Sequence, residues 1–265
     1  MLAARSISHR RLFLSHLDSG KQSNSVMIVR EQALARSTRD FRARGSKVIR
    51  CPHCLMAQQH CICGGRVKVE CRSAFCFLLY GTEVFKPSNT GRLIADIVPN
   101  NHAFLWQRTV HDPALLALLE NPKYAPILVY PHAYVESGRC IHSPSELPTV
   151  QAGKIPLFVL LDGTWREAKK MFKSSYLATL PVLGITTDRP SQYLMRDAAY
   201  QFQWCTAEVG AEVLRLAGDT AAATALDAYF GLFCRNYAAV RSQLGEKDRS
   251  GLAETFLPSA ADAQS

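Results

Sequence analysis

Short apolar runs, each bounded by turn residues, recur along the middle of the chain. They predict buried strands at residues 75–80, 104–106, 127–130, 157–161 and 182–185. The segments between and after these runs show helical spacing of apolar residues, which predicts helices at residues 90–98, 113–120, 165–173, 206–217 and 221–240. This alternation favours an α/β domain in which helices cover both faces of a mostly parallel sheet.

The charge balance is strongly basic, with 31 Lys and Arg residues against 22 Asp and Glu residues and a formal net charge of +9. A basic surface favours a polyanionic partner because it neutralises phosphates and releases their counterions. The excess is concentrated at residues 30–50, which we interpret as including a basic helix. Charge alone does not distinguish RNA from acidic lipid. No apolar run is long enough to cross a bilayer, so we expect no membrane partner.

Four of the nine cysteines cluster within thirteen residues. They are Cys51, Cys54, Cys61 and Cys63. Two short chelating pairs of this kind can close tetrahedrally around one zinc ion, and a closed four-thiolate site would be structural because it has no open coordination position. The alternatives are buried or redox-active thiols, or His53 or His60 in place of one thiol. Without a secretory signal, nine cysteines favour a reducing compartment, the cytoplasm, over a disulfide scaffold.

A polar loop follows the first predicted strand and leads into the first predicted helix of the sheet region. Its sequence, Lys-Pro-Ser-Asn-Thr-Gly-Arg, ends at Arg92. The side chain of Ser88, Asn89 or Thr90 can cap the helix, whose free backbone N–H groups can hold an anion. An ordinary helix cap with solvated Lys86 and Arg92 is the alternative interpretation.

The apolar strand at residues 157–161 ends in Asp162-Gly163-Thr164-Trp165 and leads into an amphipathic helix. In parallel sheets, ligands bind beyond the carboxyl ends of the strands. Gly163 lets the backbone approach a ligand, Thr164 can cap the helix, and Trp165 can stack on a flat ring or cover a hydrophobic pocket. A capped helix with a packed tryptophan is the purely structural alternative.

These motifs together resemble the DTW-domain family, whose naming motif is matched by Asp162-Gly163-Thr164-Trp165. The cysteine cluster, the loop at residues 86–94 and the segment at residues 205–209 (Cys-Thr-Ala-Glu-Val) also stand in the expected order. The resemblance runs from about Met27 to about Val240 and is closest to bacterial enzymes that modify uridine 47 in the tRNA variable loop. One departure is the segment at residues 189–196, where relatives carry a more basic run.

The resemblance implies a SPOUT-like α/β fold and a tRNA-uridine aminocarboxypropyltransferase. Such an enzyme moves the 3-amino-3-carboxypropyl group of S-adenosylmethionine to N3 of a uridine and releases methylthioadenosine. Asp162 is the expected acceptor of the uridine N3 proton, with Glu208 as the second choice. Glu208 as a first-turn acid stabilised by the helix dipole is an equal alternative. Thr164 and Trp165 complete the expected catalytic set.

Two further sets of contacts are expected for such an enzyme. The expected contacts to S-adenosylmethionine are Asn89, Thr90, Tyr130, Leu160 and Thr206. The expected contacts to tRNA phosphates are Arg39, Arg42, Arg44, Lys47, Arg50, Lys86, Arg92 and Arg196.

The domain organisation expected from these motifs has four parts. Residues 1–26 are rich in Arg and Ser at their start, as transit peptides are, but we interpret them as a disordered extension before a natural start near Met27. Residues 27–66 form the basic helix and zinc knuckle, residues 67–243 the SPOUT-like catalytic domain, and residues 244–265 a flexible tail.

Two other functions are compatible with the same motifs. A SPOUT-type methyltransferase would use the same co-substrate, because motifs do not reveal which carbon of its sulfonium faces the nucleophile. A zinc-knuckle RNA-binding protein without catalysis would need only the basic segment and the metal site. That reading leaves the Asp-Gly-Thr-Trp strand end unexplained.

Overall fold

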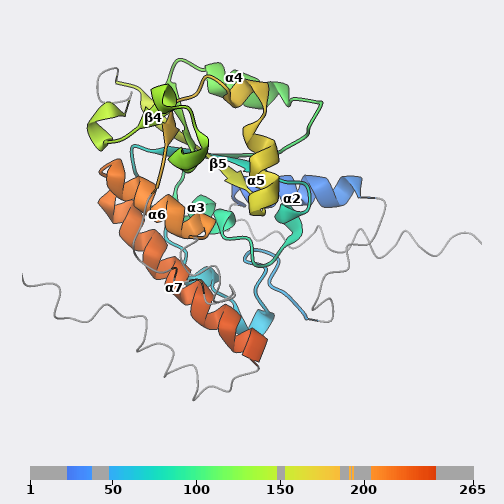
Figure 1. Cartoon of the computed structure of the whole chain (residues 1–265). Coiled ribbons are helices and arrows are strands. Elements are labelled where there is room, and N and C mark those ends of the chain that lie inside the picture. The colour runs from blue at the N-terminus through green and yellow to red at the C-terminus, as the bar shows by residue number, and fades with distance from the viewer. Residues whose placement is uncertain are drawn as a thin grey trace, which may run out of the picture.

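The computed structural model describes residues 23–37, 48–147, 153–185, 191, 193 and 204–242 (Figure 1). Its helices are α2 (Ser25–Arg36), α3 (Gly91–Ile97), α4 (Pro113–Glu120), α5 (Trp165–Phe172), α6 (Thr206–Leu216) and α7 (Thr220–Ser242). Its strands are β1 (Ala74–Leu79), β2 (Asn101–Leu105), β3 (Tyr124–Val129), β4 (Cys140–Ile141), β5 (Ile155–Asp162) and β6 (Val182–Leu183).

The six strands form one sheet in the order β2-β1-β5-β3-β6-β4, and every neighbouring pair is parallel. This confirms the α/β class and the mostly parallel sheet predicted from the sequence. The five predicted strands are all present, and β4 is the addition. Because the strands are parallel, their carboxyl ends share one edge, where Leu79 of β1 pairs with Asp162 of β5.

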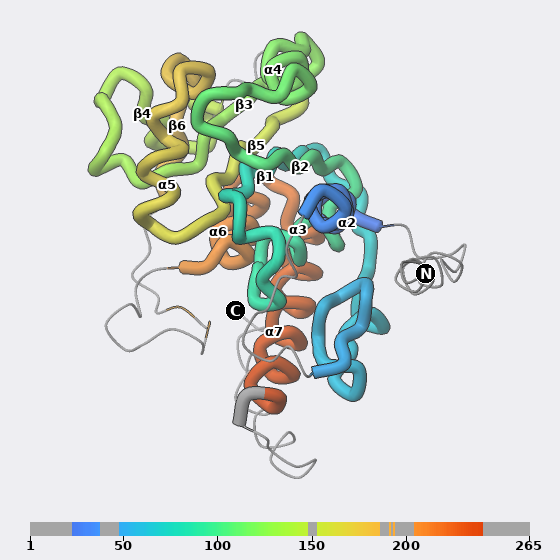
Figure 2. Tube along the Cα trace, turned by 90° about the vertical axis from the view of Figure 1, so that its right-hand side faces the viewer, coloured from blue at the N-terminus to red at the C-terminus, as the bar shows by residue number. Residues whose placement is uncertain are grey.

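Alternate residues of each central strand enter different cores. Phe75 and Phe77 of β1 pack with α3, α6 and α7, whereas Cys76 and Leu78 pack with α4 and α5. Strands buried on both faces need continuous apolar runs, which is why β1 and β5 stand out so clearly in the sequence. Helices therefore cover both faces of the sheet, with α6 and α7 together beneath it in Figure 2.

The cysteine-rich segment packs against the long helix α7. Cys54, Met56 and Ile62 belong to the same core as Tyr229 and Phe233 of α7, and Figure 2 shows the segment beside that helix. A Cβ atom at Gly65 would lie 2.5 Å from the end of the Leu232 side chain of α7, so the exit from this segment passes close to that helix.

A buried carboxylate joins four parts of the structure. Asp96 of α3 accepts hydrogen bonds from Asn24, the N-cap of α2, over 2.6 Å and from Tyr229 of α7 over 3.1 Å. It also pairs with Arg66, just after the cysteine-rich segment, at 3.0 Å. These partners satisfy a carboxylate that would otherwise be costly to bury, and they fix α2 and the cysteine-rich segment to the domain.

None of the helices in the described part of the chain is both long enough and apolar enough to span a bilayer.

Candidate active site

The carboxylate of Asp162 lies at the carboxyl end of β5, 4% exposed. Asn89 donates its side-chain N–H to Oδ2 of Asp162 over 2.8 Å, and the hydroxyl of Thr206 donates to Oδ1 over 3.1 Å. Asn89 comes from the loop before α3, and Thr206 is the first residue of α6. Three motifs that are distant in the sequence therefore meet at one carboxylate.

The surroundings of Asp162 make its ionisation difficult. Burial, together with the negative charge of Glu83, raises the pKa of Asp162 to about 7, although the hydrogen bonds from Asn89 and Thr206 favour the charged form. A carboxyl group with such a pKa exchanges protons readily near neutral pH. This is the property expected of a general base.

The turn that begins α3 lies directly against Asp162. A Cβ atom at Gly91 would overlap Oδ2 of Asp162, so this position needs a glycine for close approach rather than for an unusual backbone conformation. The side-chain oxygen of Asn89 accepts a hydrogen bond from the backbone N–H of Arg92 over 3.0 Å. The capping role predicted for this loop is therefore performed by Asn89.

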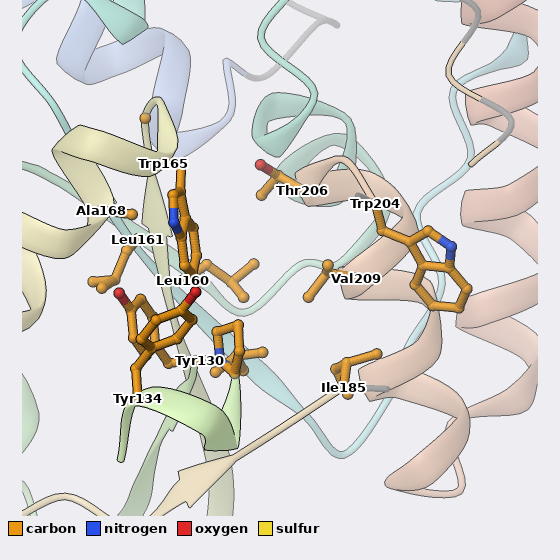
Figure 3. A pocket seen from close by; sticks show the side chains of 13 residues that line it. Tyr130, Tyr134, Leu160, Leu161, Trp165, Ala168, Ile185, Trp204, Thr206 and Val209 are labelled. Carbon is orange, nitrogen blue, oxygen red and sulfur yellow. The ribbon is translucent and has the colours of Figure 1, made fainter. Parts of the chain in front are cut away.

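An aromatic pocket of about 390 Å³ opens beside Asp162 at the same edge of the sheet (Figure 3). Tyr130 stacks on Trp165, with ring centroids 5.5 Å apart and planes inclined by 11°, and Tyr134 leans on the same indole at 5.2 Å. Across the pocket in Figure 3 stand Trp204, Val209 and other apolar side chains. Trp165 is 40% exposed, so its ring is available to a ligand.

A second, polar pocket of about 300 Å³ adjoins the aromatic pocket. Gly163 and Thr206 line both of them, so the two form neighbouring compartments. The polar pocket contains Asp162 together with Glu83 and Lys86, which form an ion pair. Together, the two pockets have the size and lining that suit a ligand with a flat apolar end and a charged, flexible end.

Of the expected co-substrate contacts, Tyr130 and Leu160 line the aromatic pocket, Thr90 lines the polar pocket and Thr206 lines both. Asn89 is buried and reaches the site through Asp162.

Two of the expected catalytic residues make helix caps. Glu208 accepts hydrogen bonds from the backbone N–H of Cys205 over 2.8 Å and from the Ser191 hydroxyl over 2.7 Å, and it lines neither pocket. This is the structural alternative considered for that residue. Thr164 lines the polar pocket while its backbone N–H and hydroxyl both donate to Glu167 over 2.7 Å, which secures the start of α5.

The expected phosphate contacts are distributed unevenly. Arg39, Arg42, Arg44, Lys47 and Arg196 lie outside the described residues. Arg92 is 1% exposed, with its guanidinium over the ring of Phe233 and bonded to the carbonyl of Pro87, so the structure places it in the interior rather than on the RNA-facing surface expected for it. Arg50 donates to the carbonyl of Leu55 within the cysteine-rich segment, and Lys86 lies in the polar pocket.

Several residues that line these pockets were not predicted from the sequence, and three of them, Glu83, Tyr134 and Trp204, bear directly on the character of the site. Tyr134 lies on a short 3-10 turn (His132–Tyr134), and Trp204 precedes α6 at the end of a sequence, residues 200–204, in which aromatic residues and glutamines alternate and for which no element was predicted. Glu83 reaches the polar pocket because β1 pairs with β5. A single aromatic or acidic residue in a loop gives no local signal, although the proximity of Trp204 to the Cys-Thr-Ala-Glu-Val motif was a hint.

The four clustered cysteines meet at one point, with all four sulfur atoms within 4.8 Å of one another. Cys51 Sγ and Cys63 Sγ are 3.7 Å apart, as are Cys54 Sγ and Cys61 Sγ. Tetrahedral zinc with Zn–S bonds of about 2.3 Å requires sulfur atoms about 3.8 Å apart, so the donor set fits zinc. Cys51 and Cys54 are buried in the core that includes residues of α7, whereas Cys61 is exposed and Cys63 is partly exposed.

Fold and site together define an α/β protein with a ligand site at the carboxyl edge of a parallel sheet and a separate cluster of metal-binding type. The model of the DTW domain matches residues 48–238, and the chain therefore belongs to the DTW-domain family. This confirms the resemblance found in the sequence. The family is associated with aminocarboxypropyl transfer to uridine in tRNA. No solved structure matches the chain.

Proposed function

We propose that this protein transfers the 3-amino-3-carboxypropyl group of S-adenosylmethionine to N3 of a uridine in tRNA, with position 47 of the variable loop as the expected target. The observation that carries the proposal is the pairing of the two pockets. An aromatic compartment suited to adenine adjoins a polar compartment that holds a carboxylate with a pKa of about 7.

In the proposed complex, the adenine lies against Trp165, beside Tyr130, in the aromatic pocket. Aromatic faces bind flat rings through stacking and apolar burial. The aminocarboxypropyl arm then extends across Gly163 and Thr206, which line both compartments, into the polar pocket. This arrangement presents the arm, rather than the methyl group, to a nucleophile near Asp162.

The proposed reaction is a displacement at the γ-carbon of the arm. Uridine N3 forms a bond to that carbon, the carbon–sulfur bond breaks, and its electron pair returns to sulfur as neutral methylthioadenosine leaves. The N3 proton passes to the carboxylate of Asp162. Hydrogen bonds from Asn89 and Thr206 keep that carboxylate in place while it changes charge.

Zinc, when bound by the four thiolates, would supply folding energy rather than chemistry. A four-thiolate site is coordinatively closed, so it offers no position at which to activate a nucleophile. It would stabilise the cysteine-rich segment against α7, and the expected phosphate contacts Arg39, Arg42, Arg44 and Lys47 directly precede that segment in the sequence.

The small-molecule product tests the proposal against methyl transfer. The protein is incubated with unmodified tRNA and S-adenosylmethionine, and the nucleoside products released from the co-substrate are separated by liquid chromatography. Methylthioadenosine formed in an amount equal to the modified uridine supports the proposal. S-adenosylhomocysteine in its place would show that the methyl carbon faces the nucleophile.

A further inference from the structure

Helix α5 presents a row of cations that begins at the mouth of the aromatic pocket. Arg166, Lys169, Lys170 and Lys173 are all exposed, whereas Ala168 and Met171 of the same helix are buried against the sheet. Spacings of three and four residues place these cations along one side of the helix, over a rise of about 10 Å.

This row contains no neutralising acid. The one acidic residue of α5, Glu167, accepts hydrogen bonds from Thr164 at the start of the helix. Within the part of the chain that the structure describes, none of the four cations forms an ion pair with a carboxylate. Clustered positive charge of this kind attracts phosphates.

The row is also joined to the pocket itself. The ammonium of Lys169 lies over the rings of Tyr134, at 4.9 Å, and Trp165, at 5.4 Å. Thr164, the N-cap of α5, lines the polar pocket together with Asp162, so a uridine that reaches Asp162 would have its neighbouring phosphates close to the first turns of α5. Single-stranded RNA is held by this combination of aromatic faces and backbone-directed cations.

We infer that the exposed face of α5 is a docking surface for the tRNA backbone on the side of the target uridine. This inference rests on the proposed function and adds a surface separate from the basic segment at residues 30–50. A lipid surface fits less well, because the exposed large hydrophobic side chains beside these cations in the described part of the chain are Trp165 and Tyr134, whose rings pack on each other with centroids 5.2 Å apart.

The test compares two double variants that remove the same charge. Arg166→Gln with Lys173→Gln neutralises two cations of the row without touching either pocket. Lys123→Gln with Lys154→Gln neutralises two exposed cations at the opposite, amino edge of the sheet, just before β3 and β5. Dissociation constants for unmodified tRNA are measured at several salt concentrations, with methylthioadenosine affinity as the check on pocket integrity.

We expect the α5 double variant to bind tRNA on the order of tenfold more weakly near 0.1 M salt, with a salt dependence shallower by about 1.4 in logarithmic slope. Methylthioadenosine affinity and the behaviour of the control variant should match the wild type. Equal losses in both double variants, or no loss in either, would overturn the inference. If the α5 variant weakens tRNA binding but the wild type forms no modified uridine, the docking surface stands and the proposed reaction falls.

Discussion

The side-chain amide of Asn89 donates to Oδ2 of Asp162 over 2.8 Å, while the carbonyl oxygen of the same amide caps α3 at Arg92. One side chain thus fixes both the helix and the carboxylate. Asn89 and Asp162 are 73 positions apart along the chain, so the loop motif and the Asp-Gly-Thr-Trp motif together hold the Asp162 carboxylate at the edge of the sheet.

Replacing Gly91 by Ala tests whether the loop before α3 positions the Asp162 carboxylate. The added Cβ atom would overlap Oδ2 of Asp162, so we expect the carboxylate to be displaced and transfer to fall by roughly 10²-fold, the cost typical of a misplaced catalytic group. Gly81→Ala is the matched control, because a Cβ atom there meets no neighbouring atom. Initial rates of uridine modification measure the effect, and a Gly91→Ala enzyme as active as Gly81→Ala would contradict the account.

The raised pKa of Asp162 predicts a particular pH dependence of stability. The folded protein holds the proton of this carboxyl more tightly than the unfolded chain, whose Asp pKa is about 3.9, so burial of Asp162 becomes increasingly costly between about pH 4 and pH 7. Asp162→Asn lacks this cost. Relative to the wild type, its free energy of unfolding should rise by roughly 1–4 kcal/mol across that range. Urea unfolding of both proteins at pH 5 and pH 8 measures this. If the variant and the wild type differ in free energy of unfolding by the same amount at both pH values, a pKa of about 7 for Asp162 is excluded.

The aromatic pocket predicts a separable contribution to ligand affinity. Trp165→Ala removes the indole that stacks on Tyr130 and should weaken methylthioadenosine binding by roughly 1–3 kcal/mol. Trp106→Phe alters an indole that stacks on Tyr80 outside the pocket and should leave affinity unchanged. Isothermal titration calorimetry distinguishes the two. Equal affinities for Trp165→Ala and the wild type would show that the adenine lies elsewhere.

The cysteine cluster predicts one zinc ion per chain with a structural role. Cys54→Ser should lose the metal and have a lower melting temperature, because the cysteine-rich segment packed on α7 would no longer be cross-linked by zinc–thiolate bonds. Cys140→Ser, which alters a partly exposed thiol outside the cluster, is the control. Metal analysis by mass spectrometry and thermal unfolding provide the readouts. Full zinc content in Cys54→Ser would rule out the four-thiolate assignment.

The sequence predicted the architecture well because the central strands are buried on both faces. Continuous apolar runs in β1, β3 and β5 and clear spacing in α4 gave strands and helices close to the observed bounds. It missed β4, since the two residues Cys140–Ile141 are too few to form a pattern. Arg92 was expected at the surface as a cation, yet every residue of α3 is buried, which depends on packing against α6 and α7.

The candidate site was predicted in part, and the division has a physical origin. Asp162 is the last residue of β5 and Trp165 the first residue of α5, and the local sequence reveals this strand end. Glu83, Tyr134 and Trp204 are brought to the pockets by strand pairing and by the course of loops, which depend on tertiary structure rather than on the local sequence pattern. Glu208 combines a suitable residue type with a suitable position, and only its hydrogen bonds to Cys205 and Ser191 reveal a capping role.

Nucleoside analysis of tRNA tests the central claim, that the Asp162 carboxylate at the end of β5 activates a uridine for attack on the aminocarboxypropyl arm. Unmodified tRNA is incubated with S-adenosylmethionine and either wild-type protein or Asp162→Asn at several pH values, digested, and examined by mass spectrometry. We predict 3-(3-amino-3-carboxypropyl)uridine from the wild type, at a rate that rises with pH and levels off above about 7, and none above background from Asp162→Asn. Full activity of a folded Asp162→Asn protein would contradict the account.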